Sequence, residues 1–231
     1  MANRTYFLNR YGFDYRLSVD DPIMEDRFRA GELCEQGMLD WIVANIPHGG
    51  IWIDAGANIG NHTQVFATAC EADIVMAFEP VPENHDNLIA NTAHLSNVIA
   101  PRLGVGCGPM LCEIIPTAQG RNCQFALKRS EGRPNTAVVS LDAIVPQDGV
   151  RLLKIDVEGA EYETLQGARM LIHRSKPEIF VEIWKQADLE LIEQWLTMQG
   201  YVLCECYNHS PTFHFSASDR YPSTYTKREL Q

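Results

Sequence analysis

From residue 51 onward, short apolar runs alternate with longer amphipathic segments, and this alternation constrains the fold more than any other feature of the sequence. Such a pattern is typical of parallel strands that are connected by crossover helices. It predicts an α/β fold with a mostly parallel sheet and helices on both faces. The expected strands are 51–55, 74–78, 97–100, 152–155, 178–183 and 201–204, and the expected helices are 60–70, 82–94, 160–173 and 189–198.

The chain has 231 residues, which suits a single domain (1–231) with one well-buried core. Within residues 1–50 we expect a β-hairpin over 6–19, turning near Tyr11-Gly12, and then a helix over 32–46. Residues 51–215 form the expected core, and 216–231 form a polar tail. The alternation fails between 101 and 135, where runs at 111–115 and 124–127 predict a small inserted hairpin.

The most informative local pattern is a glycine-containing turn between the first core strand and its helix. The stretch from Asp54 to Gly60 reads Asp-Ala-Gly-Ala-Asn-Ile-Gly. Gly56 and Gly60 would let the backbone approach a ligand closely, where any larger residue would clash. The N–H groups at the start of the following helix suit the carboxylate of an amino-acid moiety.

An acid at the end of the second core strand, Glu79, completes this pattern just before Pro80. A carboxylate there can accept hydrogen bonds from both hydroxyls of a ribose, so the pair predicts an adenosine-containing ligand. A dinucleotide would require a glycine where Asp54 stands, because a carboxylate repels a pyrophosphate. The same carboxylate favours the amino group of a methionyl moiety. The sequence therefore predicts S-adenosyl-L-methionine as the cofactor.

Three carboxylates are the candidate catalytic residues. Asp156 and Glu158 follow an expected strand, and Glu182 comes late in the next one, so all three should meet at the carboxyl edge of the sheet. A carboxylate there could act as general base for a hydroxyl nucleophile, with Asp156 the first choice. We expect Glu161 to stabilise a helix dipole and Lys154 to be a structural or snorkelling residue. His62 is expected to be a solvated helix residue.

Composition limits the partners and the cellular location. The net charge of −11 disfavours duplex nucleic acid as a substrate, whereas a small hydroxylated molecule is compatible. The apolar runs are too short to span a bilayer, no signal sequence opens the chain, and seven cysteines form no repeating framework. These features predict a cytoplasmic protein without a membrane partner. No metal is predicted, since neither the Cys and His spacing nor a group of carboxylates alone specifies one.

The motifs together resemble the FkbM family of methyltransferases over roughly residues 31–183. The matching stretches begin at Asp54, Phe78, Val139, Leu153 and Pro177, with a weaker pattern at Gly31 and Glu35. The resemblance implies a Rossmann-like class I methyltransferase fold, with seven strands of which the last is antiparallel, and O-methylation of sugars or other small molecules. The residues then expected to bind the cofactor are Glu35, Asp54, Gly56, Ala57, Asn58, Gly60, Thr63, Glu79 and Pro80.

Two other functions remain open from the sequence. One is an NAD(P)-dependent oxidoreductase, which uses the same class of fold. The other is a non-catalytic module that binds S-adenosylmethionine without turnover. The sequence predicts neither the identity of the methyl acceptor nor the oligomeric state.

Overall fold

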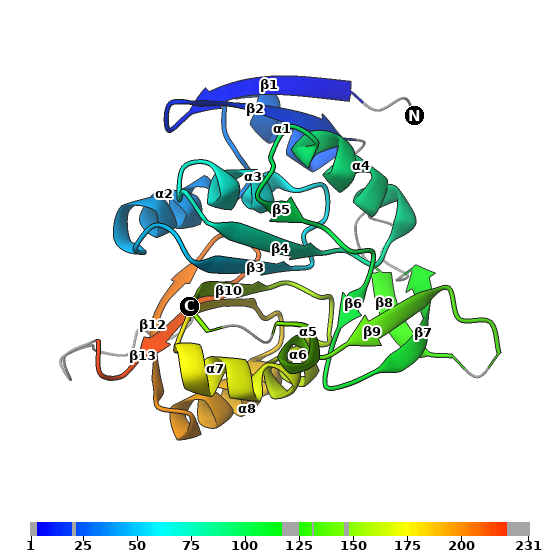
Figure 1. Cartoon of the computed structure of the whole chain (residues 1–231), viewed down its shortest axis with the longest axis vertical. Helices are drawn as coiled ribbons and strands as arrows, with labels where there is room; N and C mark the ends of the chain where they lie inside the picture. The colour runs from blue at the N-terminus through cyan, green and yellow to red at the C-terminus, as the bar shows by residue number, and fades with distance from the viewer. Residues whose placement is uncertain (1–3, 20–21, 117–124, 131, 146–147, 221–231) are drawn as a thin grey trace.

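The computed structural model describes residues 4–19, 22–116, 125–130, 132–145 and 148–220. Its centre is a seven-stranded sheet with the order β12-β13-β11-β10-β3-β4-β5, which confirms the predicted α/β class (Figure 1). Neighbouring strands are parallel except β13, which runs antiparallel to both β11 and β12. The strands are β3 (Ile51–Ala55), β4 (Ile74–Phe78), β5 (Val98–Ile99), β10 (Val150–Ile155), β11 (Glu178–Glu182), β12 (Tyr201–Tyr207) and β13 (Thr212–Ala217).

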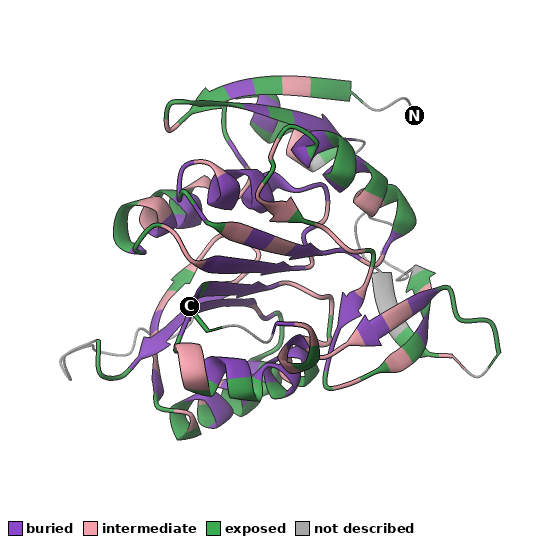
Figure 2. Ribbon diagram, in the orientation of Figure 1, coloured by how far each residue is buried: buried purple, intermediate pink, exposed green. Residues whose placement is uncertain are grey.

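Helices cover both faces of this sheet (Figure 1). One face carries α1 (Pro22–Arg29), α2 (Gln36–Asn45), α3 (Asn61–Ala67) and α4 (Pro82–Thr92). The other carries α5 (Leu141–Ile144), α6 (Glu161–Gly167), α7 (Arg169–Ser175) and α8 (Gln186–Met198). Because the central strands are sandwiched, they are buried along most of their length (Figure 2), and apolar residues fill both faces.

The helix predicted over 160–173 is two helices, α6 and α7, which meet at Ala168, whose φ of −110° and ψ of 10° are not helical. A Cβ at Gly167 would lie 1.9 Å from the carbonyl oxygen of Gly106, so only glycine fits where these two backbones meet. The start of the second helix, α7, is capped by Asp142 of α5. Both carboxylate oxygens of Asp142 accept backbone N–H groups, from Met170 at 2.9 Å and from Leu171 at 2.7 Å.

A second, four-stranded sheet lies beside the main one, at the edge toward which β3 and β4 point (Figure 1). Its order is β6 (Gly104–Val105), β9 (Thr136–Val139), β7 (Met110–Pro116) and β8 (Phe125–Arg129). The antiparallel pair β7 and β8 is the predicted hairpin, although Gln124 lies outside the described residues. The sequence did not predict β6 and β9, which extend the hairpin into a sheet.

The N-terminal hairpin is confirmed, with β1 (Arg4–Arg10) and β2 (Phe13–Val19) paired around Tyr11-Gly12. The helix expected over 32–46 begins only at Gln36, because Glu35 adopts a left-handed conformation with φ of 58°. The short helix α1 was not predicted. None of the described helices combines the length and the apolar character that crossing a bilayer requires.

The start of the expected polar tail was placed too early. Ser216 is completely buried in β13, where its hydroxyl donates a hydrogen bond to Glu178 at 2.9 Å. Polar side chains of a strand can be buried when they form hydrogen bonds, and Glu178 is the hydrogen-bond acceptor for Ser216. The prediction for 221–231 falls outside the described residues.

Candidate active site

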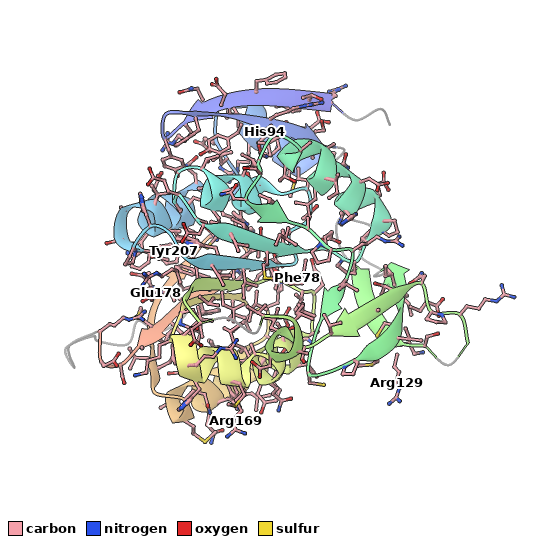
Figure 3. The ribbon with its side chains drawn as sticks, in the orientation of Figure 1. Phe78, His94, Arg129, Arg169, Glu178 and Tyr207 are labelled. Carbon is pink, nitrogen blue, oxygen red and sulfur yellow. The ribbon has the colours of Figure 1, made fainter. Side chains whose placement is uncertain are left out.

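A pocket of about 600 Å³, open to solvent, lies at the carboxyl ends of β3, β4 and β10. This is the edge of an open α/β sheet at which ligands normally bind. Figure 3 labels Phe78, the last residue of β4, which lines the pocket. The lining residues are Gly56, Asn58, Phe78, Glu79, Pro80, Val81, Asn84, Leu103, Gly104, Val105, Asp156, Val157 and Glu158.

Glu79 is a buried carboxylate in the wall of this pocket, with 4% of the residue exposed. Its two oxygens accept backbone N–H groups, from Asn58 at 2.9 Å and from Val81 at 2.9 Å. These bonds fix the carboxylate between the glycine-containing turn and the start of α4. Burial raises the pKa of Glu79 to about 7, against the opposing effect of the backbone hydrogen bonds.

Close packing within the chain requires a glycine at position 56, and a positive φ favours glycine at positions 56 and 60, whereas the approach of a ligand to this turn stays a prediction. A Cβ at Gly56 would lie 1.6 Å from the carbonyl oxygen of Asp156, and one at Gly60 would lie 2.7 Å from a methyl carbon of Leu88. Both glycines also have positive φ, 82° and 86°. Gly56 therefore allows β10 to come close to the turn, which brings Asp156 to the pocket.

Asp54 lies beneath the pocket and does not line it. It is completely buried, and its Oδ2 accepts the Thr63 hydroxyl at 2.6 Å. The ammonium of Lys154 lies 3.5 Å from its Oδ1. Lys154 was expected to be a structural or a snorkelling residue, and the structure shows the structural alternative: it is 3% exposed, because β10 runs through the centre of the sheet. Its ammonium also contacts Asp156 at 3.2 Å.

The three predicted catalytic carboxylates meet as the sequence indicated. Oxygen atoms of Asp156, Glu158 and Glu182 all lie within 4.8 Å of one another. Burial would raise the pKa of Asp156, but Lys154 and a hydrogen bond with Glu182 outweigh it and hold that pKa below its ordinary value. Burial and the neighbouring Asp156 raise the pKa of Glu182 to about 9. The two carboxyl groups therefore share one proton at neutral pH, with Asp156 ionised and Glu182 protonated.

Glu158 completes the group from the turn after β10. Burial and the charge of Asp156 raise its pKa to about 7. Its φ of 56° is left-handed, a conformation that costs energy for a residue with a side chain and occurs often at functional sites. Glu161 lies in the first turn of α6, as expected, and accepts the N–H of Gly159 at 2.9 Å.

A histidine that was expected in solvent lies beside this cluster. His62 is 8% exposed, and its Nε2 lies 3.1 Å from Oε2 of Glu35. Glu35 raises the pKa of both Lys154 and Glu182 through its charge, among larger effects, so it is close to the carboxylate group. His62 is the second residue of α3. It is removed from water because α3 packs against the segment around Glu35, whose backbone is left-handed.

The nine predicted cofactor residues fall into three groups in the structure. Four line the pocket: Gly56, Asn58, Glu79 and Pro80. Four others are buried and are not among its lining residues: Asp54, Ala57, Gly60 and Thr63. Glu35 is close to the carboxylates. Sequence reasoning missed the wall contributed by Leu103 to Val105. No local motif marks that segment, and only the crossover into the small sheet brings it to the pocket.

Comparisons with known proteins agree with this architecture. The model of the family described as the methyltransferase FkbM domain matches residues 54–203. The hexuronic acid methyltransferase AglP of Haloferax volcanii is 27% identical over 161 residues, covering 68% of this chain and 65% of AglP. The methyltransferase sdnD of Sordaria araneosa is 26% identical over 198 residues, covering 69% of this chain and 76% of sdnD.

A solved structure shares the fold. Methyltransferase FkbM from Methylobacillus flagellatus KT superposes with a TM-score of 0.56 at 20% identity, covering 74% of this chain and 45% of that protein. The present chain thus spans less than two thirds of AglP and less than half of the M. flagellatus protein. The family match extends over well more than half of the sequence and includes the glycine-containing turn, Glu79 and the carboxylate group. The chain belongs to the FkbM methyltransferase family.

Proposed function

We propose that this protein is an S-adenosylmethionine-dependent methyltransferase that methylates a hydroxyl group of a small acceptor. The observation that carries the proposal is that one pocket has Glu79 in its wall on the β4 side and Asp156 in its wall on the β10 side. The carboxylate of Glu79 can accept hydrogen bonds from the hydroxyls of a ribose, and the carboxylate of Asp156 can accept a proton. A nucleoside cofactor and a hydroxyl nucleophile could therefore be held at the same edge of the sheet.

The pocket residues fit the cofactor in their chemistry. Glu79 uses its hydrogen bonds to backbone N–H groups for anchoring, and a carboxylate has further lone pairs for the two hydroxyls of a ribose. Asn58 Oδ1 is buried without a hydrogen-bond partner among the described residues, so it can accept a donor from a ligand. When bound, S-adenosylmethionine supplies a methyl group that is electrophilic.

The carboxylates supply the acid–base chemistry. Asp156 is ionised at neutral pH because Lys154 and Glu182 stabilise its charge, so it can accept the proton of the acceptor hydroxyl. Glu182 is protonated and donates its hydrogen bond to Asp156, which keeps the pair at one net charge. A general base typically contributes about 10²- to 10⁴-fold in rate, and positioning of the hydroxyl contributes the remainder.

The charge of the site favours a neutral acceptor, such as a sugar without a carboxyl group. Asp156, Glu158 and Glu182 converge there, and Lys154 already contacts two carboxylates. A carboxylate on the acceptor, next to the reacting hydroxyl, would add a further negative charge in a partly buried place. We therefore expect this protein to prefer a neutral acceptor, whereas AglP is named for an acidic one, a hexuronic acid.

Calorimetric titration with S-adenosylhomocysteine tests the cofactor half of the proposal. The wild-type protein should bind it, and Glu79→Ala should weaken binding by about 10- to 100-fold through loss of charge-assisted hydrogen bonds. Asp86→Ala, at an exposed acid on α4, is the control and should bind like the wild type. Absence of binding by a folded wild-type protein at millimolar ligand, or equal binding of NAD, would contradict the proposal.

Mass-spectrometric detection of methyl transfer tests the acceptor half. Matched pairs such as a methyl glucoside and the corresponding glucuronide should differ, with the neutral member methylated faster. Asp156→Asn should lower the rate by about 10²-fold or more while cofactor binding persists. Cofactor binding with no transfer to any hydroxylated acceptor would instead indicate a non-catalytic module.

A further inference from the structure

Lys154 occupies a position in which a lysine is expensive to keep. It lies on β10 in the middle of the seven-stranded sheet, and 3% of its side chain is exposed. A buried ammonium requires partners for its charge and its three N–H donors. Lys154 donates hydrogen bonds to Asp156 Oδ2 at 3.2 Å and to the Gly56 carbonyl oxygen at 3.4 Å, and its charge also faces Asp54 Oδ1 at 3.5 Å as an ion pair without a hydrogen bond.

Two of these partners are fixed independently of Lys154. Asp54 is opposite Lys154 in the β3–β10 register and is held by the Thr63 hydroxyl at 2.6 Å. The Gly56 carbonyl belongs to the turn, whose neighbouring N–H groups of Gly56 and Ala57 bond to the Phe78 carbonyl at 2.9 and 3.0 Å. Asp54 and Gly56 thus anchor the ammonium, and the third partner, Asp156, is the one that lines the pocket.

We propose that Lys154 is a positioning residue that orients the Asp156 carboxylate toward the pocket and makes Asp156, rather than Glu182, the ionised member of the carboxyl pair. Among the described residues the ammonium forms ion pairs with Asp156 and Asp54 and none with Glu182, so its charge acts more strongly on Asp156 than on Glu182. With it, the negative charge is localised on Asp156. The proposal rests on the proposed function only for the use of that charge, which is to accept the proton of the acceptor.

The charged and titratable groups around Asp156 come from every element packed against it. Negative or acidic groups are Glu182 on β11, Glu158 and Glu161 after β10, Glu79 after β4, Asp54 on β3 and Glu35 before α2. His62 on α3 also acts on Asp156, by lowering its pKa. Lys154 is therefore the one permanent cation in contact with Asp156 among the described residues, and removing it takes away the largest effect that lowers the pKa of Asp156.

NMR titration of the carboxyl groups tests the proposal without cofactor or acceptor. In protein labelled with ¹³C at the Asp carboxyl carbons, the Asp156 signal is assigned by its loss in Asp156→Asn. In Lys154→Met the pKa of Asp156 should rise by about 1 to 3, and Lys154→Arg should restore a value below the ordinary one. Lys176→Met is the matched control, because Lys176 pairs with Asp219 at 2.7 Å far from the site and should leave Asp156 unchanged.

An unchanged Asp156 titration in folded Lys154→Met would overturn the proposal. If that variant does not fold, the wild-type protein decides the question through the ¹⁵Nζ signal of Lys154. The chemical shift of that signal should change at the pH at which Asp156 titrates. A chemical shift that stays constant through this titration would also refute the proposed role of Lys154. Since neither measurement involves methyl transfer, a failure here is distinguishable from a failure of the proposed function.

Discussion

The two glutamates of β11 stand at opposite ends of the same strand and show how partners determine the role of a buried acid. Glu178 begins the strand and accepts hydrogen bonds from His214 at 2.8 Å, Ser216 at 2.9 Å and Arg220 at 2.8 Å. Glu182 ends it beside the carboxylates of Asp156 and Glu158. Figure 3 labels Glu178, which begins the strand that pairs with β13.

Their pKa values move in opposite directions for this reason. Burial would raise the pKa of Glu178, but its hydrogen bonds to His214 and Arg220 outweigh it and lower that pKa. Burial and Asp156 raise the pKa of Glu182 to about 9. Glu178 thus stabilises the fold in its charged form, whereas Glu182 costs stability whenever the pH favours ionisation of the unfolded chain. An acid kept at a cost to stability is more typical of a functional site than of a structural one.

The largest effect should come from Glu178→Ala. The change leaves the buried His214 and Ser216 without their shared acceptor, and we expect a loss of about 3 kcal/mol in the free energy of unfolding, measured with urea. The value allows for the partial exposure of Arg220, whose ion pair with Glu178 is screened by solvent. Asp86→Ala should change stability by less than about 0.5 kcal/mol. Equal losses for the two variants would remove the distinction between Glu178 and a surface acid.

Glu182→Gln should change stability in the other direction. The folded pKa of about 9 lies above the ordinary value of 4.5, so the folded state binds the extra proton and wild-type stability falls as the pH rises from about 4.5 to 9. Glutamine is neutral at every pH and removes this loss. We expect a gain on the order of 1–2 kcal/mol at pH 8 and little difference at pH 4, from urea unfolding at both pH values. A variant less stable than the wild type at pH 8 would show that the hydrogen bond from Glu182 to Asp156 stabilises the fold by more than the raised pKa of Glu182 costs.

The smallest effect should come from Ser216→Ala. Glu178 keeps its bonds to His214 and Arg220, so only one hydrogen bond is lost, and we expect a cost of about 1 kcal/mol. Thermal unfolding measures the difference, with Ser218→Ala, at an exposed position just beyond β13, as the control. If Ser216→Ala unfolds at the same temperature as the wild type, the hydrogen bonds from His214 and Arg220 are sufficient for Glu178.

Local motifs predicted which edge of the sheet carries the functional residues better than they predicted the contacts among those residues. The carboxylates after β10 and at the end of β11 were expected to meet because parallel strands place their carboxyl ends at one edge, and they do. The role of Asp54 could not be predicted in the same way. Its neighbour in the sheet is Lys154, a residue 100 positions later, and only the β3–β10 register reveals that the two charges pair.

The sequence alone determined the α/β class, the glycine-containing turn and the edge at which the acids gather, because each depends on periodicity or on short-range spacing. The tertiary structure decided which acids are ionised, which face the pocket and which stabilise the fold. Those properties depend on burial and on partners that are distant in the sequence, such as Lys154 for Asp156 and His214 for Glu178. Charge interactions depend on distance in space and on exclusion of water, and neither can be read from a linear pattern.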